Sequence, residues 1–502
     1  MPGREITSAY HLFFRELEII KDLESGEKNQ RSGRGTDPKM REDTIAAIST
    51  AFGEGGIGIV RISGEEAGRI LKEIFVPESG TGEITARMLT YGKIVDPKTE
   101  EVIDEVLAVF MPAPGTYTTE DVAEIDCHGS VVSLRRVLSL CLERGARLAE
   151  PGEFTKRAFL GGRLDLSQAE AVIDVVKAKT DLGFDVAMKQ LEGSVSEEVT
   201  RIRQRLMDVL VDIAVNIDYP DEDIEEVVYE KMADQLAAIK TDVDRLLSSA
   251  GSGRLISEGI AVSIIGKPNV GKSTLMNALL RESRAIVTAV PGTTRDTIEE
   301  TVNLKGIPLR LTDTAGIRET TDEIERIGIE KSKDSFNRAD LVIFILDASS
   351  GLEDEDEEIM EAVARSAVEG KRVLVLLNKQ DKGRVLEKEE IEKRLPGCRV
   401  IETSLGVDGS SEPVEEAIAD MVHAGDLRQE NSLVVTNARH EDLLRKASSQ
   451  IGDAIEMTRL GEPLEVIEID IDQSRQHLGE IIGETATGDI IDEVFSRFCL
   501  GK

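Results

Sequence analysis

Apolar positions in the first part of the chain occur in short runs that predict β-strands. Runs such as Ile57–Ile62 and Val102–Phe110 are of strand length and are separated by clusters rich in Gly, Pro and Ser. One longer stretch, Val131–Arg144, has the apolar spacing of a helix. We therefore expect a mixed α+β domain over residues 43–158.

The pattern then changes, and apolar residues recur at helical spacing. Leu206, Val209 and Ile213 illustrate this repeat, with charged residues filling the positions between them. The repeat predicts long helices packed as a bundle, which give way at Gly251–Gly253 to a different pattern. Helical spacing returns after Gly425 and continues to the C-terminus.

Strands and helices alternate regularly between these two helical parts. Five strands are expected, at Ala261–Ile265, Leu309–Asp313, Leu341–Asp347, Arg372–Lys379 and Arg399–Ser404. Such alternation is typical of a doubly wound α/β sheet with helices on both faces.

These patterns together predict a multidomain α/β and α fold, in which the α/β module is inserted into a helical domain. The expected parts are a flexible N-terminal extension at 1–42, an α+β domain at 43–158, a first helical part at 159–256, the α/β module at 257–424 and a second helical part at 425–502.

Composition indicates which partners and which cellular compartment suit the protein. Its 61 basic and 96 acidic residues give a net charge of −35, which repels nucleic-acid phosphates, so contact with RNA would need a local basic patch or a partner. The four cysteines (Cys127, Cys141, Cys398 and Cys499) lie far apart, which favours reduced thiols over a disulfide framework. No apolar run approaches the ~20 residues of a membrane span. We expect a cytoplasmic protein without a membrane anchor.

The segment Gly266–Ser273, GKPNVGKS, fits the phosphate-binding pattern GxxxxGK[ST] and directly follows an apolar strand. Glycines allow backbone N–H groups to surround phosphate oxygens, and Lys272 adds a full positive charge. The Ser273 hydroxyl is placed to bind Mg²⁺. The segment predicts a P-loop nucleotide site.

Two later segments define the nucleotide. Asp313–Gly316 (DTAG) ends the next strand, where a carboxylate can hold the Mg²⁺ shell and a glycine N–H can reach the γ-phosphate. Asn378–Asp381 (NKQD) ends a later strand, and the Asp381 carboxylate can accept two hydrogen bonds from guanine. Adenine presents an acceptor instead and would leave this carboxylate unpaired. The expected nucleotide is GTP.

The residue after DTAG is Ile317, which cannot orient water as a glutamine can. The segment 288–296 (TAVPGTTRD) is typical of a first switch loop, with Thr294 as a second Mg²⁺ ligand. Arg295 and Arg318 are candidates for stabilising charge in hydrolysis, although each is also compatible with an ordinary solvated residue.

GKPNVGKS, PGTTRD, DTAGIR and NKQD together resemble the Era-like GTPases. Three further stretches, GGIGIVRISG, PGEFTKRAFLGGRLDLSQAEAV and the terminal FCLGK, narrow this resemblance to the MnmE (TrmE) family of tRNA-modification GTPases. The similarity covers about residue 43 to residue 502. It implies a Ras-like P-loop GTPase domain and an N-terminal domain that resembles tetrahydrofolate-binding domains.

The resemblance implies a GTP site that includes Asn269, Val270, Gly271, Lys272, Ser273, Thr274, Thr288, Thr293, Thr294, Asp313, Thr314, Ala315, Gly316, Asn378, Lys379, Asp381 and Ser404. Mg²⁺ is expected at Ser273 and Thr294. A K⁺ ion, held by Asn269, Thr288, Val290 and Thr293, would replace an arginine finger. Glu325 matches the family's catalytic glutamate, and hydrolysis is expected to require two G domains facing each other in a homodimer.

The resemblance also assigns candidates outside the GTPase domain. Arg61, Glu124, Arg163 and Lys502 are expected to bind a tetrahydrofolate derivative in its 5-formyl or methylene form. Position 163 is a lysine in some relatives, so the hydrogen-bond geometry of Arg163 differs from theirs. Cys499 is a candidate catalytic thiol, with a packed apolar side chain as the alternative.

The implied function is the addition of a carboxymethylaminomethyl or aminomethyl group to C5 of the wobble uridine in certain tRNAs. The expected partner is MnmG (GidA), which would supply FAD and NADH chemistry. Two alternatives remain open: a ribosome-assembly or regulatory GTPase switch, and a folate-dependent transferase whose GTPase domain is a relic.

Overall fold

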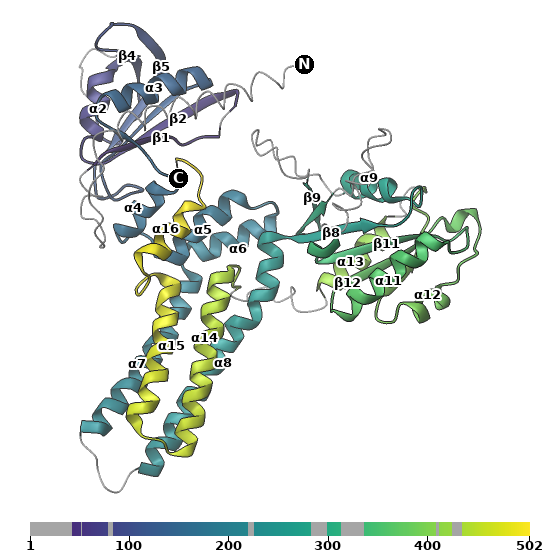
Figure 1. The fold of residues 1–502 in the computed structure, drawn as a ribbon. Coiled ribbons are helices and arrows are strands. Elements are labelled where there is room, and N and C mark those ends of the chain that lie inside the picture. The colour runs from purple at the N-terminus through teal and green to yellow at the C-terminus, as the bar shows by residue number, and fades with distance from the viewer. Residues whose placement is uncertain are drawn as a thin grey trace, which may run out of the picture. The chain divides into compact units, whose positions relative to one another are not determined.

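The computed structural model describes residues 43–51, 53–78, 84–218, 225–282, 299–312, 336–407, 411–423 and 434–501 (Figure 1). The chain divides into two compact units. The first comprises Met1–Ile173, Gln190–Gln204 and Arg475–Lys502, and the second comprises Asp174–Lys189 and Arg205–Ser474.

The first unit contains a seven-stranded sheet in the order β3-β4-β5-β6-β2-β1-β7. Its strands are β1 (Ile45–Ile48), β2 (Gly55–Ser63), β3 (Phe75–Pro77), β4 (Thr90–Val95), β5 (Val102–Met111), β6 (Val122–Gly129) and β7 (Arg147–Leu148). All neighbouring pairs are antiparallel except β1 and β7.

Helices α2 (Ala67–Ile74) and α3 (Val131–Glu143) share a core with the strands of this sheet. Val60 and Ile62 of β2 belong to this core, so Arg61 between them points to the opposite face because side chains alternate along a strand. The strands predicted at 57–62 and 102–110 and the helix predicted at 131–144 are present, within one to two residues of the expected bounds at most ends.

Short helices complete the first unit. Leu166 of α5 (Leu166–Lys177) forms a second apolar cluster with Phe495 of α16 (Gly488–Ser496), so residues far apart in the chain share one core. Helix α4 (Glu153–Leu160) lies beside α16.

The short helix α6 (Asp181–Leu191) is followed by four long helices: α7 (Ser194–Asp218), α8 (Glu225–Glu258), α14 (Ala438–Leu460) and α15 (Leu464–Ile482). Helices α8 and α14 run side by side over much of their length (Figure 1). The helical pattern was predicted to end at Gly251–Gly253, and this position is wrong, because α8 continues through both glycines. A Cβ on Gly253 would lie 2.0 Å from the carbonyl oxygen of Val435, so the missing side chain serves close packing rather than a helix end.

The second unit also contains a six-stranded sheet in the order β13-β12-β11-β8-β10-β9. Its strands are β8 (Ile260–Ile265), β9 (Glu299–Leu304), β10 (Ile307–Thr312), β11 (Leu341–Asp347), β12 (Arg372–Asn378) and β13 (Arg399–Glu402). All neighbours are parallel except β9 and β10.

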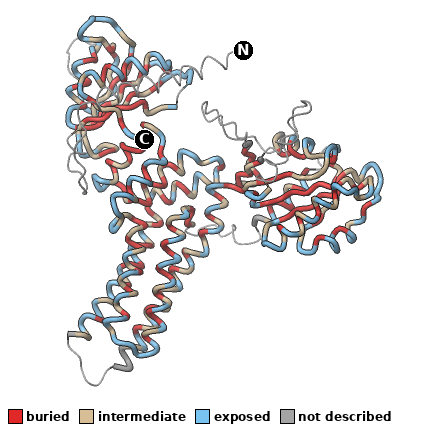
Figure 2. The backbone as a smooth tube through the Cα atoms, in the orientation of Figure 1, coloured by how far each residue is buried: buried red, intermediate tan, exposed pale blue. Residues whose placement is uncertain are grey.

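Helices cover both faces of this sheet. Helices α9 (Lys272–Glu282) and α13 (Glu412–His423) contribute to the core on one face, and α11 (Asp354–Val368) and α12 (Lys388–Arg394) to the core on the other. Successive side chains of strand β11 belong alternately to the two cores, so this strand is buried on both sides (Figure 2). The predicted combination of an α+β part, helices and a doubly wound P-loop module is confirmed. Strand β9 was not predicted.

None of the helices within the described ranges is both long and apolar enough to cross a membrane.

Candidate functional site

The P-loop connects the end of β8 to the start of α9, as the sequence predicts. Gly266 and Gly271 have φ values of +142° and +120°, which favour glycine. Each glycine also allows a close approach of other chain segments. A Cβ on Gly266 would lie 2.5 Å from the carbonyl oxygen of Ile345, and a Cβ on Gly271 would lie 2.3 Å from Nδ2 of Asn378. The two glycines therefore shape the loop and let it lie close to β11 and β12.

Asn269 is an exposed residue of this loop. Its backbone adopts the left-handed conformation, with φ of +63°. Asparagine tolerates this conformation better than most residues that carry a Cβ. Its amide is held at the open side of the loop, where a ligand can reach it.

Lys272 lies over its own loop. Its Nζ donates to the carbonyl oxygens of Gly266 and Lys267, the latter at 2.9 Å. Burial lowers the pKa of Lys272, against a smaller opposing effect of Glu355. Among the described residues, the half-buried ammonium donates to neutral carbonyl oxygens, so an anion in the loop would stabilise its charge more strongly.

Asn378 joins the P-loop to the part of the site expected to read the base. Only 3% of this residue is exposed. Its Nδ2 donates to the carbonyl oxygen of Val270 (2.7 Å), and its Oδ1 accepts from the backbone N–H of Leu405 (2.9 Å). One amide therefore positions the phosphate loop and the segment after β13 together.

The other residues of the NKQD segment lie at the same end of β12. Lys379 has φ of +66° and its Nζ lies 2.6 Å from the carboxylate of Asp347 at the end of β11. Burial tends to raise the pKa of Asp347, but Lys379 and Ser349 outweigh it, so this pKa lies below its ordinary value. Asp381 lies in a short 3-10 helix, Gln380–Lys382, and is exposed, so its carboxylate is accessible to a base.

The expected switch and tail residues lie outside the described part of the chain. They are Thr288, Val290, Thr293, Thr294, Asp313, Thr314, Ala315, Gly316, Arg318, Glu325 and Lys502.

The structure brings together three of the four candidate folate residues within the first unit, two on neighbouring strands of the sheet and Arg163 in the turn after α4. Arg61 faces Glu124 across β2 and β6, and Arg61 Nε lies 2.7 Å from Glu124 Oε1. Oε2 of Glu124 accepts no hydrogen bond from the residues that the structure describes. The pair thus leaves one carboxylate oxygen for a donor-rich ligand.

An aromatic residue links this pair to Arg163. The Tyr117 ring lies 5.7 Å from the Arg61 guanidinium and 4.7 Å from that of Arg163, whose Nη1 also donates to the Tyr117 carbonyl (3.2 Å). Phe154 of α4 lies 5.7 Å from Arg61. Two cations, a carboxylate and the Tyr117 ring therefore lie in one region, beside the buried Phe154 ring, a combination that suits a flat, polar heterocycle with an anionic tail.

The C-terminal tail packs against this unit. Phe498 is buried, and the N–H of Gly152 donates to the carbonyl oxygen of Cys499 (3.4 Å). Gly501 has φ of +85°, and a Cβ there would lie 2.2 Å from the carbonyl oxygen of Ile48 at the end of β1. Cys499 is exposed between these anchored neighbours, so the alternative of a packed side chain is not supported.

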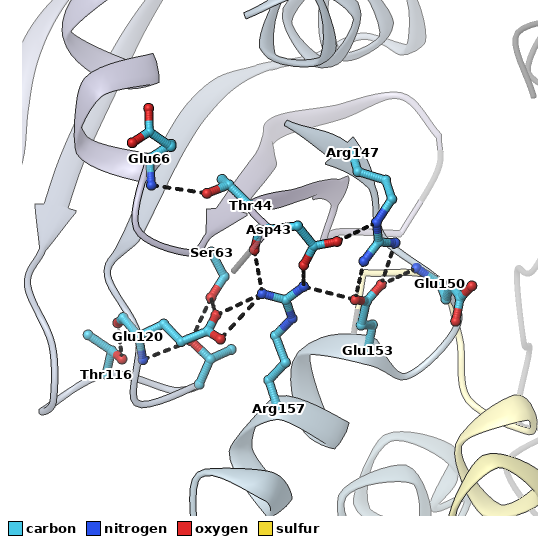
Figure 3. A network of polar contacts seen from close by, with 11 residues as sticks. Asp43, Thr44, Ser63, Glu66, Thr116, Glu120, Arg147, Glu150, Glu153 and Arg157 are labelled. Carbon is cyan, nitrogen blue, oxygen red and sulfur yellow. Dashed lines mark hydrogen bonds and ion pairs between the residues drawn. The ribbon is translucent and has the colours of Figure 1, made fainter. Parts of the chain in front are cut away.

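A partly buried ionic network holds α4 to the sheet (Figure 3). Arg157, of which 4% is exposed, contacts Asp43 (2.6 Å), Glu153 (3.0 Å) and Glu120 (3.2 Å). Arg147 contacts the same Asp43 and Glu153 at 2.8 Å and 2.6 Å. The network fixes the helix that carries Phe154.

Two carboxyls of this network, Asp43 and Glu153, are held ionised. Burial alone would raise the pKa of Asp43 and Glu153, but hydrogen bonds and charge from Arg147 and Arg157 keep both pKa values below the ordinary range.

Sequence reasoning did not single out Tyr117, Phe154, Arg157 or Asp347. Phe154 and Arg157 lie in the PGEFTKRAFL stretch that carries the resemblance, and Asp347 ends a predicted strand. Phe154, Arg157 and Asp347 could therefore have been found from the sequence, because each lies in a segment that the sequence singles out. Tyr117 could not, because it lies in a loop without a recognisable pattern.

Comparison with known proteins agrees with this geometry. The family model described as the MnmE helical domain matches residues 166–499, more than half of the chain, and the model described as the GTP-binding protein TrmE N-terminus matches residues 44–163.

Curated relatives match over almost their whole length. The tRNA modification GTPase MnmE of Alkaliphilus oremlandii is 50% identical over 463 residues, which cover 92% of this chain and 99% of the relative. The proteins of the same name from Clostridioides difficile and Bacillus thuringiensis are 49% and 47% identical, each over 92% of this chain and 99% and 100% of the relative. The chain therefore belongs to the MnmE family of tRNA-modification GTPases.

Proposed function

We propose that this GTPase uses GTP hydrolysis to drive formation of a carboxymethylaminomethyl or aminomethyl group at C5 of the wobble uridine of certain tRNAs. The observation that carries the proposal is the coexistence, in one chain, of a P-loop tied to the NKQD segment and a second site of two cations, a carboxylate and an aromatic ring. A regulatory switch would need only the first of these.

The nucleotide part of the proposal rests on the P-loop. Ser273 would hold Mg²⁺ together with Thr294, and Asn269 would hold K⁺ together with Thr288, Val290 and Thr293. The exposed Asn269 amide supports this, because its oxygen is a suitable ligand for a hard cation. Bound there, these ions would supply positive charge to the phosphates during hydrolysis.

The one-carbon part rests on the first unit. Glu124 would accept N–H donors of a pterin ring through its second oxygen, while Arg61 and Arg163 would attract the ligand's carboxylates. Cys499, on the tail that packs against the end of β1, would act near this ligand. Ile48 at that end pairs with Val60, the neighbour of Arg61, which supports the placement.

The partner would be the FAD-dependent protein MnmG, which would also bind tRNA. The net charge of −35 supports this division of labour, since this chain by itself repels a polyanion. The protein would act as a homodimer in the cytoplasm.

Nucleoside analysis of tRNA tests the proposal. A strain lacking the protein should lose the C5-modified wobble uridine, and the wild-type gene should restore it. Lys272→Ala should fail to restore it, because the P-loop loses its phosphate-binding charge, whereas Lys382→Ala, at an exposed lysine of the same module, should restore it fully. Unchanged wobble uridines in the deletion strain would favour the regulatory switch instead.

A further inference from the structure

Lys267 occupies a variable position of the phosphate-binding pattern, and its side chain is tied to a helix outside the loop. Its Nζ lies 2.8 Å from Oδ2 of Asp356, in the first turn of α11, and 3.3 Å from Oε2 of Glu353. The side chains of Lys267 and Asp356 are 11% and 2% exposed, whereas that of Glu353 is 67% exposed. The contact with Asp356 is therefore the one that is shielded from solvent and screened little by salt.

Asp356 is held in place by its own helix. Its Oδ2 also accepts from the backbone N–H of Glu353 (3.1 Å), as part of a capping box at the start of α11. Met360 and Val363 anchor this helix in the core on one face of the sheet. Oδ1 of Asp356 is buried and accepts no hydrogen bond from the described residues. The charge of this carboxylate is therefore compensated mainly by Lys267.

The backbone of Lys267 belongs to the nucleotide site. Its carbonyl oxygen accepts from Nζ of Lys272 (2.9 Å), the lysine expected to meet the phosphates. Three residues further on, the carbonyl oxygen of Val270 accepts from Nδ2 of Asn378 (2.7 Å). Asn269 lies between these two anchored residues, in its left-handed conformation. Contacts from outside the loop thus fix both ends of the segment that carries Asn269.

We propose that Asp356 is a positioning residue for GTP hydrolysis, which acts through its ion pair with Lys267. The pair holds the P-loop in the shape that presents the Lys272 ammonium to the phosphates and the Asn269 amide to the activating cation. The expected effect on K⁺ activation rests on the proposed cation site, whereas the expected effect on turnover at saturating GTP does not.

Steady-state GTP turnover by the full-length protein tests this role. Asp356→Asn keeps an oxygen for the capping box and removes the charge. Its kcat at saturating GTP should fall about tenfold, because small misplacements of reacting groups are costly. The K⁺ concentration at half-maximal activation should rise about threefold or more, since a less constrained Asn269 binds a cation more weakly. Asp354→Asn, at an exposed aspartate of the same helical turn, is the matched control and should change both values less than about twofold.

Variants of Lys267 provide a second arm. Lys267→Met should lower kcat as far as Asp356→Asn does, and Lys267→Arg should recover most of that loss, because arginine can pair with the same carboxylate. The double variant with Met at 267 and Asn at 356 should be no slower than either single variant, since both substitutions break one contact. Thermal unfolding of each variant checks that it is folded at the assay temperature.

Three results would count against this role or against the proposal beneath it. A low kcat for Lys267→Met beside a wild-type kcat for Asp356→Asn would show that Lys267 acts on the nucleotide directly, and would overturn the inference. A lower unfolding temperature for Asp356→Asn with unchanged kcat and K⁺ response would leave this residue a purely structural role. If wild type turns over equally fast in K⁺ and Na⁺, the proposed cation site fails, and kcat at saturating GTP alone decides the role of Asp356.

Discussion

At the scale of single residues, Asn378 carries more of the nucleotide site than its position in a motif suggests. Its side chain spans from the P-loop to the segment after β13, and the backbone atoms that it contacts belong to Val270 and Leu405. Gly271 is open to this amide only because it lacks a Cβ. The residue is thus a connector within the protein, in addition to any contact that it makes with GTP.

We expect Asn378→Ala to lower both guanine-nucleotide affinity and stability. The substitution leaves a buried carbonyl and a buried N–H without partners, at a cost of about 1–3 kcal/mol each. Titration with a fluorescent GDP analogue and thermal unfolding without nucleotide measure the two effects. Lys382→Ala, at an exposed residue of the same segment, is the control. A variant with weakened nucleotide binding but an unchanged unfolding temperature would show that Asn378 acts on the ligand alone.

At the scale of elements, α4 depends on ion pairs with residues far away in the chain. Arg157 reaches Asp43, 114 positions earlier, and Arg147 reaches the same carboxylate. Since α4 has eight residues and would be marginal in isolation, these contacts and its buried face hold it in place. The helix in turn holds Phe154 against Arg61.

This network predicts a stability that depends on acid pH. The pKa values of Asp43 and Glu153 are lower in the folded protein, so their stabilisation is present above the ordinary carboxyl pKa, near 4, and is lost as the pH falls through the folded values. The unfolding temperature of wild type should therefore fall between pH 6 and pH 3.

Glu153→Gln should be less stable than wild type at pH 7 and should show a shallower fall, because the titrating group is gone. Glu150→Gln is the matched control, at an exposed glutamate three residues away. Parallel pH profiles for wild type and Glu153→Gln would contradict the role of the network.

At the scale of the whole molecule, hydrolysis is proposed to need a cation and a second copy of the chain. Of the proposed K⁺ ligands, Asn269 belongs to the P-loop. The others, Thr288, Val290 and Thr293, belong to the predicted switch loop at 288–296. Ile317 replaces the glutamine that orients water in many GTPases, so additional charge must come from elsewhere.

We expect GTP turnover to be at least about tenfold faster in K⁺ than in Na⁺ at equal ionic strength, because a correctly placed charge stabilises the transition state. Turnover per protein molecule should also rise with protein concentration as dimers of G domains form. Asn269→Ser should reduce the rate in K⁺ to that in Na⁺, whereas Pro268→Ala, at the exposed neighbour, should not. Equal wild-type rates in both salts would remove Asn269 from the proposed K⁺ site.

The sequence by itself determined most strands of the GTPase module and the presence of a GTP site. Strands such as Leu341–Asp347 and the loop Gly266–Ser273 were predictable, because apolar period, glycine content and motif spacing act between chain neighbours. The family resemblance added Arg61, Glu124 and Arg163. Gly253 was misread, because a glycine in a sequence does not reveal whether it ends a helix or admits a neighbouring backbone.

Only the tertiary structure decided which distant residues meet. The Arg61–Glu124 pair depends on the register of β2 against β6, and the placement of Gly501 against Ile48 depends on how the two ends of the chain fold together. The exposed position of Met207, Val211 and Val215 on α7 also emerged only there, because the sequence does not tell which apolar row of the helix the bundle buries. Local patterns define elements, whereas long-range packing selects their partners.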